Sequence, residues 1–185
     1  MWSMTCTPSR HATLLESLRS AVGDKAEILY AKGSNIYYDE RLEKGAVGIR
    51  PLERGDNRQL LDDALATAAR ADIIVAALGE CAEMSGESPS RTNLEIPDAQ
   101  QDLLKALVKT GKPVVLLLFT GRPLILNWES EHIPSILNVW FGGSETGDAV
   151  ADVLFGKAVP CGKLTTTFPR SVGQLPLFYN HLNTG

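Results

Sequence analysis

The sequence predicts an α/β fold, a three-layer α/β/α sandwich around an open, mostly parallel, flavodoxin-like sheet of about five or six strands. Short apolar runs alternate with longer segments at helical spacing, which is the pattern of βαβ units. The runs Ile73–Leu78 and Pro113–Phe119 are continuously apolar, as is typical of strands buried on both faces. With 185 residues, 44% of them hydrophobic, the chain can bury one core. We therefore expect one domain over residues 1–185, with 170–185 as a tail toward a following domain.

The first part of the chain predicts two helices and one strand before the first long apolar run. Apolar residues follow helical spacing from near His11, and Ala26–Tyr30 then reads as a short strand. Residues 36–55 mix tyrosines, charges and glycine without a period, so we expect a loop there. Asp56 is a good N-cap for a second helix, which leads into the strand at 72–78.

The second part continues the alternation. Pro97 stands where the first turn of a helix tolerates proline, and Gly111 is placed to end that helix. Strands are expected at 113–119, at Ser135–Phe141 and, from its threonines, at Lys163–Phe168. Together with the two earlier runs this gives five strands.

The last predicted helix has its own start signal. Ser144 is a suitable N-cap, and Glu145 falls in the first turn of a helix over Thr146–Phe155. A carboxylate at that end is stabilised by the helix dipole. We therefore expect Glu145 to interact with the dipole of its helix and not to bind a substrate.

Composition and charge exclude several classes of function. The net charge of −4 and the lack of a basic stripe argue against nucleic-acid binding. The longest apolar run, Val114–Phe119, is too short to span a bilayer, and the N-terminus has no signal-peptide core. Three cysteines and three histidines are scattered without metal-ligand spacing, so we expect no metal and no cofactor. A free-standing nucleotide- or flavin-binding domain would carry a glycine-rich phosphate loop after its first strand. The sequence has no such loop at the expected spacing, which argues against that function.

The most informative stretch is the loop Gly79–Pro97, which follows a buried strand. Open α/β sheets carry their chemistry in such loops. This loop holds one cation, Arg91, beside four carboxylates, which are Glu80, Glu83, Glu87 and Glu95. Composition alone favours a solvated surface loop, but the order of the residues suggests more.

Eight short phrases occur in one order along the chain. They are Gly79-Glu80, Gly86–Thr92, Ile96-Pro97 with Gln100 or Gln101 and Leu103-Leu104, Gly111–Val115, Thr120–Leu124, Trp140–Gly147, Ala151–Gly156, and Gly162–Leu164 before Phe168-Pro169. In this order they resemble the C-terminal α/β sandwich domain of glycoside hydrolase family 3, and most of all the periplasmic bacterial β-glucosidases. Thr165 and Cys161 depart from the family pattern, away from the expected chemistry.

The resemblance implies a divided active site. In that family a preceding barrel domain supplies a nucleophilic Asp, and this domain lends the general acid/base Glu, four residues before an Arg. Glu87 and Arg91 fit that spacing, whereas Glu80 and Glu83 do not and are expected to be surface or loop-shaping residues. A retaining glycosidase needs two carboxyls about 5–5.5 Å apart, and the acid must keep its proton near neutral pH.

The resemblance also suggests supporting residues. A tryptophan before the first helix lines the outer sugar subsite in that family, which makes Trp2 a candidate; the alternative is a terminal Trp packed into the domain. Arg91 is expected either to tie its loop down, with Glu145 as partner, or to be a solvated charge. Arg122 as a sugar contact is a lesser alternative. Trp128 and Trp140 are expected to be packing residues.

The partners and location follow from the same resemblance. We expect the barrel domain of the same polypeptide as the main partner, a β-glucoside or oligosaccharide as substrate, and a periplasmic or secreted parent protein. Alone, the chain is expected to be inactive because it lacks the nucleophile. The alternative function is a non-catalytic carbohydrate-binding or interdomain packing module.

Overall fold

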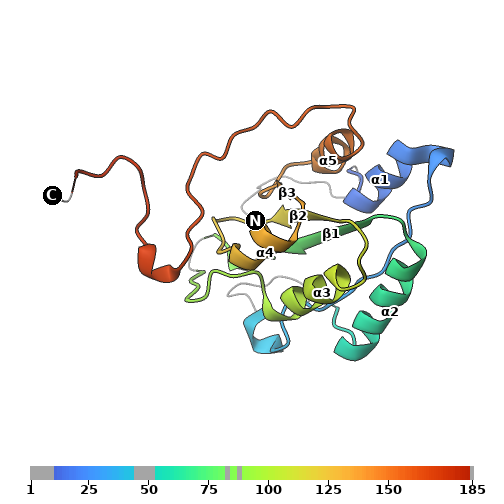
Figure 1. Cartoon of the computed structure of the whole chain (residues 1–185), viewed down its shortest axis with the longest axis horizontal. Coiled ribbons are helices and arrows are strands. Elements are labelled where there is room, and N and C mark those ends of the chain that lie inside the picture. The colour runs from blue at the N-terminus through green and yellow to red at the C-terminus, as the bar shows by residue number, and fades with distance from the viewer. Residues whose placement is uncertain (1–10, 44–52, 82–83, 87–88, 184–185) are drawn as a thin grey trace. The chain divides into compact units, whose positions relative to one another are not determined.

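The computed structural model describes residues 11–43, 53–81, 84–86 and 89–183 (Figure 1). The chain divides into two compact units. A helical unit comprises Met1–Tyr30 and Phe141–Lys163, and a sheet unit comprises Ala31–Trp140 and Leu164–Gly185. That the chain forms one domain remains a prediction.

The sheet unit contains three parallel strands, so the α/β prediction is confirmed in that respect. They are β1 (Ile74–Gly79), β2 (Val114–Phe119) and β3 (Ser135–Asn138), in the order β1-β2-β3. Every residue of β1 pairs with a residue of β2, from Ile74 with Val114 to Gly79 with Phe119. Because the strands are parallel, the residues that follow β1 and β2 emerge at the same edge of the sheet.

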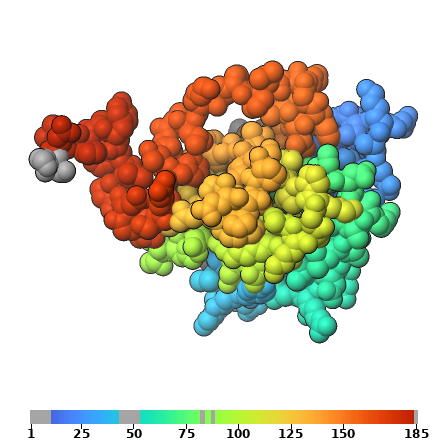
Figure 2. Space-filling model, viewed as in Figure 1, coloured from blue at the N-terminus to red at the C-terminus, as the bar shows by residue number. Residues whose placement is uncertain are grey.

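Three α-helices pack with this sheet. They are α2 (Asn57–Arg70), α3 (Asp98–Val108) and α4 (Asn127–His132), preceded by a 3₁₀ turn at Glu40–Glu43. The predicted cap of α2 is confirmed, because the Asp56 carboxylate accepts a hydrogen bond from the Gln59 amide at 2.9 Å. Figure 2 shows the segments of α3 and α4, yellow-green and orange, side by side. Lys105 Nζ of α3 lies 5.8 Å from the centroid of the Trp128 ring of α4.

Alternation along the strands builds the core between sheet and helices. One face of β1 and β2 supplies buried residues that meet apolar residues of α2 and α3, and Trp128 packs against the same cluster. The cluster comprises Ala64, Ala68, Ile74, Ala76, Leu78, Ile96, Leu103, Leu104, Leu107, Val114, Leu116, Leu118, Leu124 and Ile133. Trp140 lies 6.0 Å from Phe168, between ring centroids. Both tryptophans therefore pack as expected.

The helical unit is built on α1 (Leu14–Val22) against α5 (Thr146–Leu154), with a 3₁₀ turn at Gly23–Lys25 after α1. Helix α1 begins with a capping box formed by Thr13 and Glu16. Gly147 of α5 lies so close to Ser17 that a Cβ would stand 2.5 Å from the hydroxyl oxygen. The small residue is what lets the two helices meet.

The predicted first residue of α5, Thr146, is confirmed, but the predicted N-cap was wrong by one residue. Glu145, not Ser144, is the N-cap, and no side chain caps the helix there. Instead the Thr146 hydroxyl donates to the Gly143 carbonyl at 2.6 Å, which satisfies the turn before the helix. The side chain of a good capping residue acts only where the backbone turn puts it next to the amides.

The prediction of five strands was also wrong, since the described residues contain three. Residues 26–30 and 163–168 belong to no strand, and both Tyr30 and Leu164 are exposed. Strand propensity depends on a neighbour that can accept the backbone hydrogen bonds, and these two segments have none. The third strand ends at Asn138, earlier than predicted, because Trp140 takes a positive φ of 59° and turns the chain. The tail carries only a 3₁₀ turn, Val172–Gln174.

Gly79 ends β1 at a point of close backbone approach. Its φ is 137°, and an added Cβ would stand 1.9 Å from the carbonyl oxygen of Phe119 in β2. Neither the backbone angle nor the space admits a side chain. Glycine at this position is therefore required by the contact between the two strands.

We predict that Gly79→Ala destabilises the chain by about 2 kcal/mol or more, because strain and a backbone clash act together. Chemical denaturation with far-ultraviolet circular dichroism measures the loss. Gly111→Ala is the matched control, since its φ is also positive (76°) but its Cβ meets no atom within 4 Å. Equal losses in the two variants would show that the close approach to Phe119 contributes nothing.

Glu129 of α4 is a buried carboxyl in the core, with 2% of its surface exposed. Burial raises its pKa above the ordinary value of 4.5, against the opposing effects of its own backbone amide and of Lys105. The nearby Glu95 also raises this pKa, and His132 lowers it. The folded chain therefore holds a proton here at pH values where the unfolded chain has lost it.

The expected consequence is a stability that falls as pH rises above 4.5, because the folded state binds more protons in that window. Glu129→Gln removes this contribution, so its unfolding free energy should depend less on pH than that of the unchanged chain. Urea unfolding at several pH values between 4 and 8 measures the difference. Glu131→Gln, at an exposed carboxylate of the same helix, is the control and should leave the pH dependence as it was.

Candidate functional site

The carboxyl edge of the sheet is organised around Glu80, the residue that follows β1. Its backbone amide donates to the Phe119 carbonyl at 2.7 Å, which continues the ladder between β1 and β2 by one bond. Its side chain is fully buried. Glu80 therefore shapes its loop, and the alternative expectation of a surface residue was wrong.

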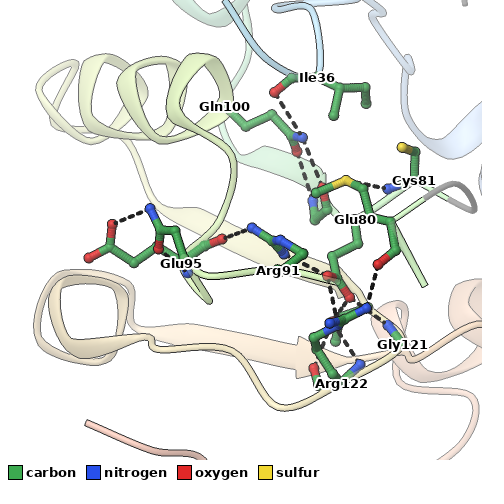
Figure 3. Close-up of polar contacts among 12 residues, drawn as sticks. Ile36, Glu80, Cys81, Arg91, Glu95, Gln100, Gly121 and Arg122 are labelled. Carbon is green, nitrogen blue, oxygen red and sulfur yellow. Dashed lines mark hydrogen bonds and ion pairs between the residues drawn. The ribbon is translucent and has the colours of Figure 1, made fainter. Parts of the chain in front are cut away.

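Four groups surround the Glu80 carboxylate (Figure 3). Arg91 donates from Nη1 to Oε1 at 2.6 Å, and Arg122 forms an ion pair through Nε with the same oxygen at 3.1 Å. The Thr120 hydroxyl and the Gly121 amide donate to Oε2 at 2.8 and 3.0 Å. We call these five residues the Glu80 cluster.

The two arginines extend the cluster to both sides of a short loop segment. Arg91 donates from Nη2 to the Glu95 carbonyl at 2.8 Å. Arg122 donates from Nη2 to the carbonyl of Met84. Figure 3 shows Arg91 between Glu95 and Glu80, with Arg122 on the other side of the carboxylate. One buried carboxylate thus links the exits of β1 and β2 to the two flanks of the loop.

The cluster carries two guanidinium groups against one carboxylate. Arg91 is nearly buried, with 8% of its side chain exposed, and Arg122 is about a quarter exposed at 24%. Removing one partner from such a buried pair costs about 3–5 kcal/mol, because the other charge is left without compensation. Tyr37 stands near this charge: burial raises its pKa, while Arg91 acts to lower it.

Gln100 of α3 holds the last residue of β1 from the helix side. Its side-chain oxygen accepts from the Gly79 amide at 2.7 Å, and its amide donates to the Gly79 carbonyl at 2.9 Å. A second, longer contact of the amide reaches the Ile36 carbonyl at 3.5 Å. The side chain thus pairs with β1 as a neighbouring strand would, directly before Glu80.

The structure places two of the four sequence-predicted site residues. Arg91 lies in the Glu80 cluster, so it is not a solvated charge. Glu145 is at the start of α5 in the helical unit, and its pairing with Arg91 remains a prediction. Trp2 and Glu87 lie outside the described residues.

Sequence reasoning missed the central role of Glu80 and underrated Thr120 and Gln100. The available signal was their presence in the phrases Gly79-Glu80, Thr120–Leu124 and Gln100 or Gln101. Arg122 was considered as a sugar contact, but its guanidinium is directed to Glu80 and Met84. Nothing in a single sequence says that a carboxylate 11 residues before an arginine will face it.

The Glu80 cluster anchors the loop that follows β1 to the sheet. Among the described residues, no group of three His, Cys, Asp or Glu side chains is arranged to hold a metal ion. None of the described helices is both long and apolar enough to cross a membrane. What the cluster does is fix the direction in which the loop leaves the sheet.

Comparison with known proteins identifies the fold. Residues 1–185 match the family described as the glycosyl hydrolase family 3 C-terminal domain. A periplasmic beta-glucosidase of Salmonella typhimurium is 47% identical over the whole chain, and a beta-xylosidase of Formosa agariphila is 39% identical over 93% of it. The chain spans 24% and 21% of these two relatives, so it corresponds to about a quarter of their length.

Solved structures of β-glucosidases support the same family assignment. A β-glucosidase from Erythrobacter marinus superposes with a TM-score of 0.78 at 33% identity, covering 96% of this chain and 25% of that one. A beta-glucosidase from Listeria innocua in complex with gluconolactone gives a TM-score of 0.63 at 43% identity, covering 67% of this chain and 18% of that one. The predicted resemblance is confirmed: this chain belongs to the glycosyl hydrolase family 3 C-terminal domain family.

Proposed function

We propose that this chain is the part of a retaining β-glucosidase that supplies the general acid/base, Glu87, to an active site completed by a barrel domain of the same polypeptide. The observation that carries the proposal is the 47% identity over the whole chain to a periplasmic beta-glucosidase. Glu87 is four residues before Arg91, as the family pattern requires.

The anchoring of the loop supports this role. A general acid must approach the leaving oxygen to within hydrogen-bond distance, so the group that carries it has to be held in place. Glu87 lies in sequence between Met84 and Arg91, and both of these are held by the Glu80 cluster. A loop rooted in this way is suited to present a side chain to another domain.

The reaction requires a second carboxyl from the barrel. In a retaining glycosidase the nucleophile forms a glycosyl-enzyme intermediate while the acid protonates the leaving oxygen, and the same residue then deprotonates the attacking water. The chain spans about a quarter of the relatives' length, which leaves room in the parent protein for the barrel. No cofactor takes part in this proposal.

The proposed substrates are terminal β-D-glucosyl residues. The identity to a beta-xylosidase of Formosa agariphila, 39% over 93% of the chain, favours β-xylosides as the second candidate. Both sugars present the same glycosidic oxygen to the acid, so Glu87 has the same role in either case. We place the parent protein in the periplasm or outside the cell, as the name of the Salmonella relative suggests.

In the whole protein that carries this chain, Glu87→Ala should slow glycosidic cleavage most for substrates with poor leaving groups. We expect kcat/KM for phenyl β-D-glucoside to fall by about 100-fold or more and kcat/KM for 2,4-dinitrophenyl β-D-glucoside to change little, since the latter leaves without protonation. Azide should restore part of kcat for the good leaving group. A uniform loss without rescue by azide would contradict the role of Glu87.

The isolated chain should bind and hydrolyse β-glucosides poorly, because it lacks the nucleophile. Hydrolysis of an aryl β-glucoside by residues 1–185 at the rate of the whole protein would disprove the divided site.

Calorimetric titration with cello-oligosaccharides and xylo-oligosaccharides tests the alternative function, a non-catalytic carbohydrate-binding module. Micromolar binding by the isolated chain, unchanged by Glu87→Ala, would favour a non-catalytic carbohydrate-binding module.

A further inference from the structure

Among the described residues, the Glu80 cluster is the largest buried group of charges. None of its members is a reacting group in the proposed reaction. Glu80 has no exposed side-chain surface, so it cannot touch a substrate. Any effect of Glu80 on the reaction must therefore be exerted through the residues that its carboxylate binds.

The cluster holds one segment at both of its ends. On the amino-terminal side, Arg122 binds the carbonyl of Met84. On the carboxyl-terminal side, Arg91 itself belongs to the loop and is bound by Glu80 at 2.6 Å. Both arginines meet the same oxygen of the same carboxylate. In the sequence, Glu87 falls between Met84 and Arg91, two attachment points that share one anchor.

The anchor itself is fixed to the sheet. The Glu80 amide continues the β1–β2 ladder, and its second carboxylate oxygen accepts from Thr120 and Gly121 after β2. The carboxylate therefore has a full set of donors from rigid elements and from the loop. A change at Glu80 therefore alters contacts that join the loop to the strands.

We infer that Glu80 is a positioning residue for the acid/base step: its carboxylate sets where Glu87 stands by holding both ends of the segment 85–90. This inference rests on the proposed function of Glu87. It assigns to a buried residue directly after β1 a role in leaving-group protonation, with Arg122 as the mediator to one end of the segment. A displacement of about 1 Å in a reacting group is enough to slow a step by about 100-fold.

The test compares four variants of the whole protein: Glu80→Gln, Arg122→Gln, Glu87→Ala and Glu95→Gln. Glu80→Gln keeps the shape but places amide hydrogens where the carboxylate accepts from donors. Arg122→Gln removes the contact to Met84 and leaves the pair between Glu80 and Arg91. Glu95→Gln is the matched control, because its carboxylate is exposed in the same loop and Arg91 binds only its backbone carbonyl.

The readout is kcat/KM for phenyl and for 2,4-dinitrophenyl β-D-glucoside, with thermal unfolding of each variant as the measure of folding. We expect Glu80→Gln to reduce the value for the phenyl glucoside by about 10- to 100-fold and that for the dinitrophenyl glucoside by less than about threefold. Arg122→Gln should show the same preference with a smaller loss, and Glu95→Gln should match the unchanged protein. A purely structural role would lower both values together, through the fraction of folded protein.

Each outcome of this test supports or overturns the inference about Glu80, and the outcomes separate it from the proposed function of Glu87. If Glu87→Ala shows the dependence on leaving group and folded Glu80→Gln loses both substrates equally or neither, the inference is overturned and the proposed function stands. If Glu87→Ala itself lacks that dependence, the proposed function fails and the inference falls with it. If Glu80→Gln does not fold, Arg122→Gln decides in its place, because its side chain is partly exposed and Glu80 keeps its other partner.

Discussion

The ion pair between Glu80 and Arg91, joined by Arg122, is the interaction on which the carboxyl edge of the sheet depends. It places one negative charge and two positive charges where water is largely excluded. Such a site is stable only when each carboxylate oxygen has its donors, and here both oxygens do. The loop after β1 is consequently held at its root by charge and hydrogen bonds, in addition to the apolar packing of Met84, Leu94 and Ile96.

This arrangement is possible because neighbouring parallel strands end at one edge. The register that pairs Gly79 with Phe119 brings Glu80 beside Thr120, although 40 residues separate them. Gly79 lets the two backbones approach without a side chain between them, and Gln100 satisfies both of its backbone groups from α3. The position of Glu80 is therefore set by the sheet, and the loop takes its position from Glu80.

For a site shared between two domains, this way of anchoring has a chemical advantage. A general acid on a loop can reach into another domain's pocket, but its contribution depends on geometry as well as on its protonation state. Arg91 and Arg122 hold the described parts of the loop through backbone carbonyls, those of Glu95 and Met84.

The sequence alone determined the α/β class, the helices, the strands at 72–78 and 113–119, the family and the candidate Glu87, because apolar periodicity and ordered local phrases carry that information. It overestimated the sheet: 26–30 and 163–168 have strand propensity, yet no neighbouring backbone pairs with them. It did not indicate Glu80 as a partner of Arg91. Only the tertiary structure decided that Glu80 is buried between Arg91 and Arg122, because long-range register, and not local sequence, determines which charges meet.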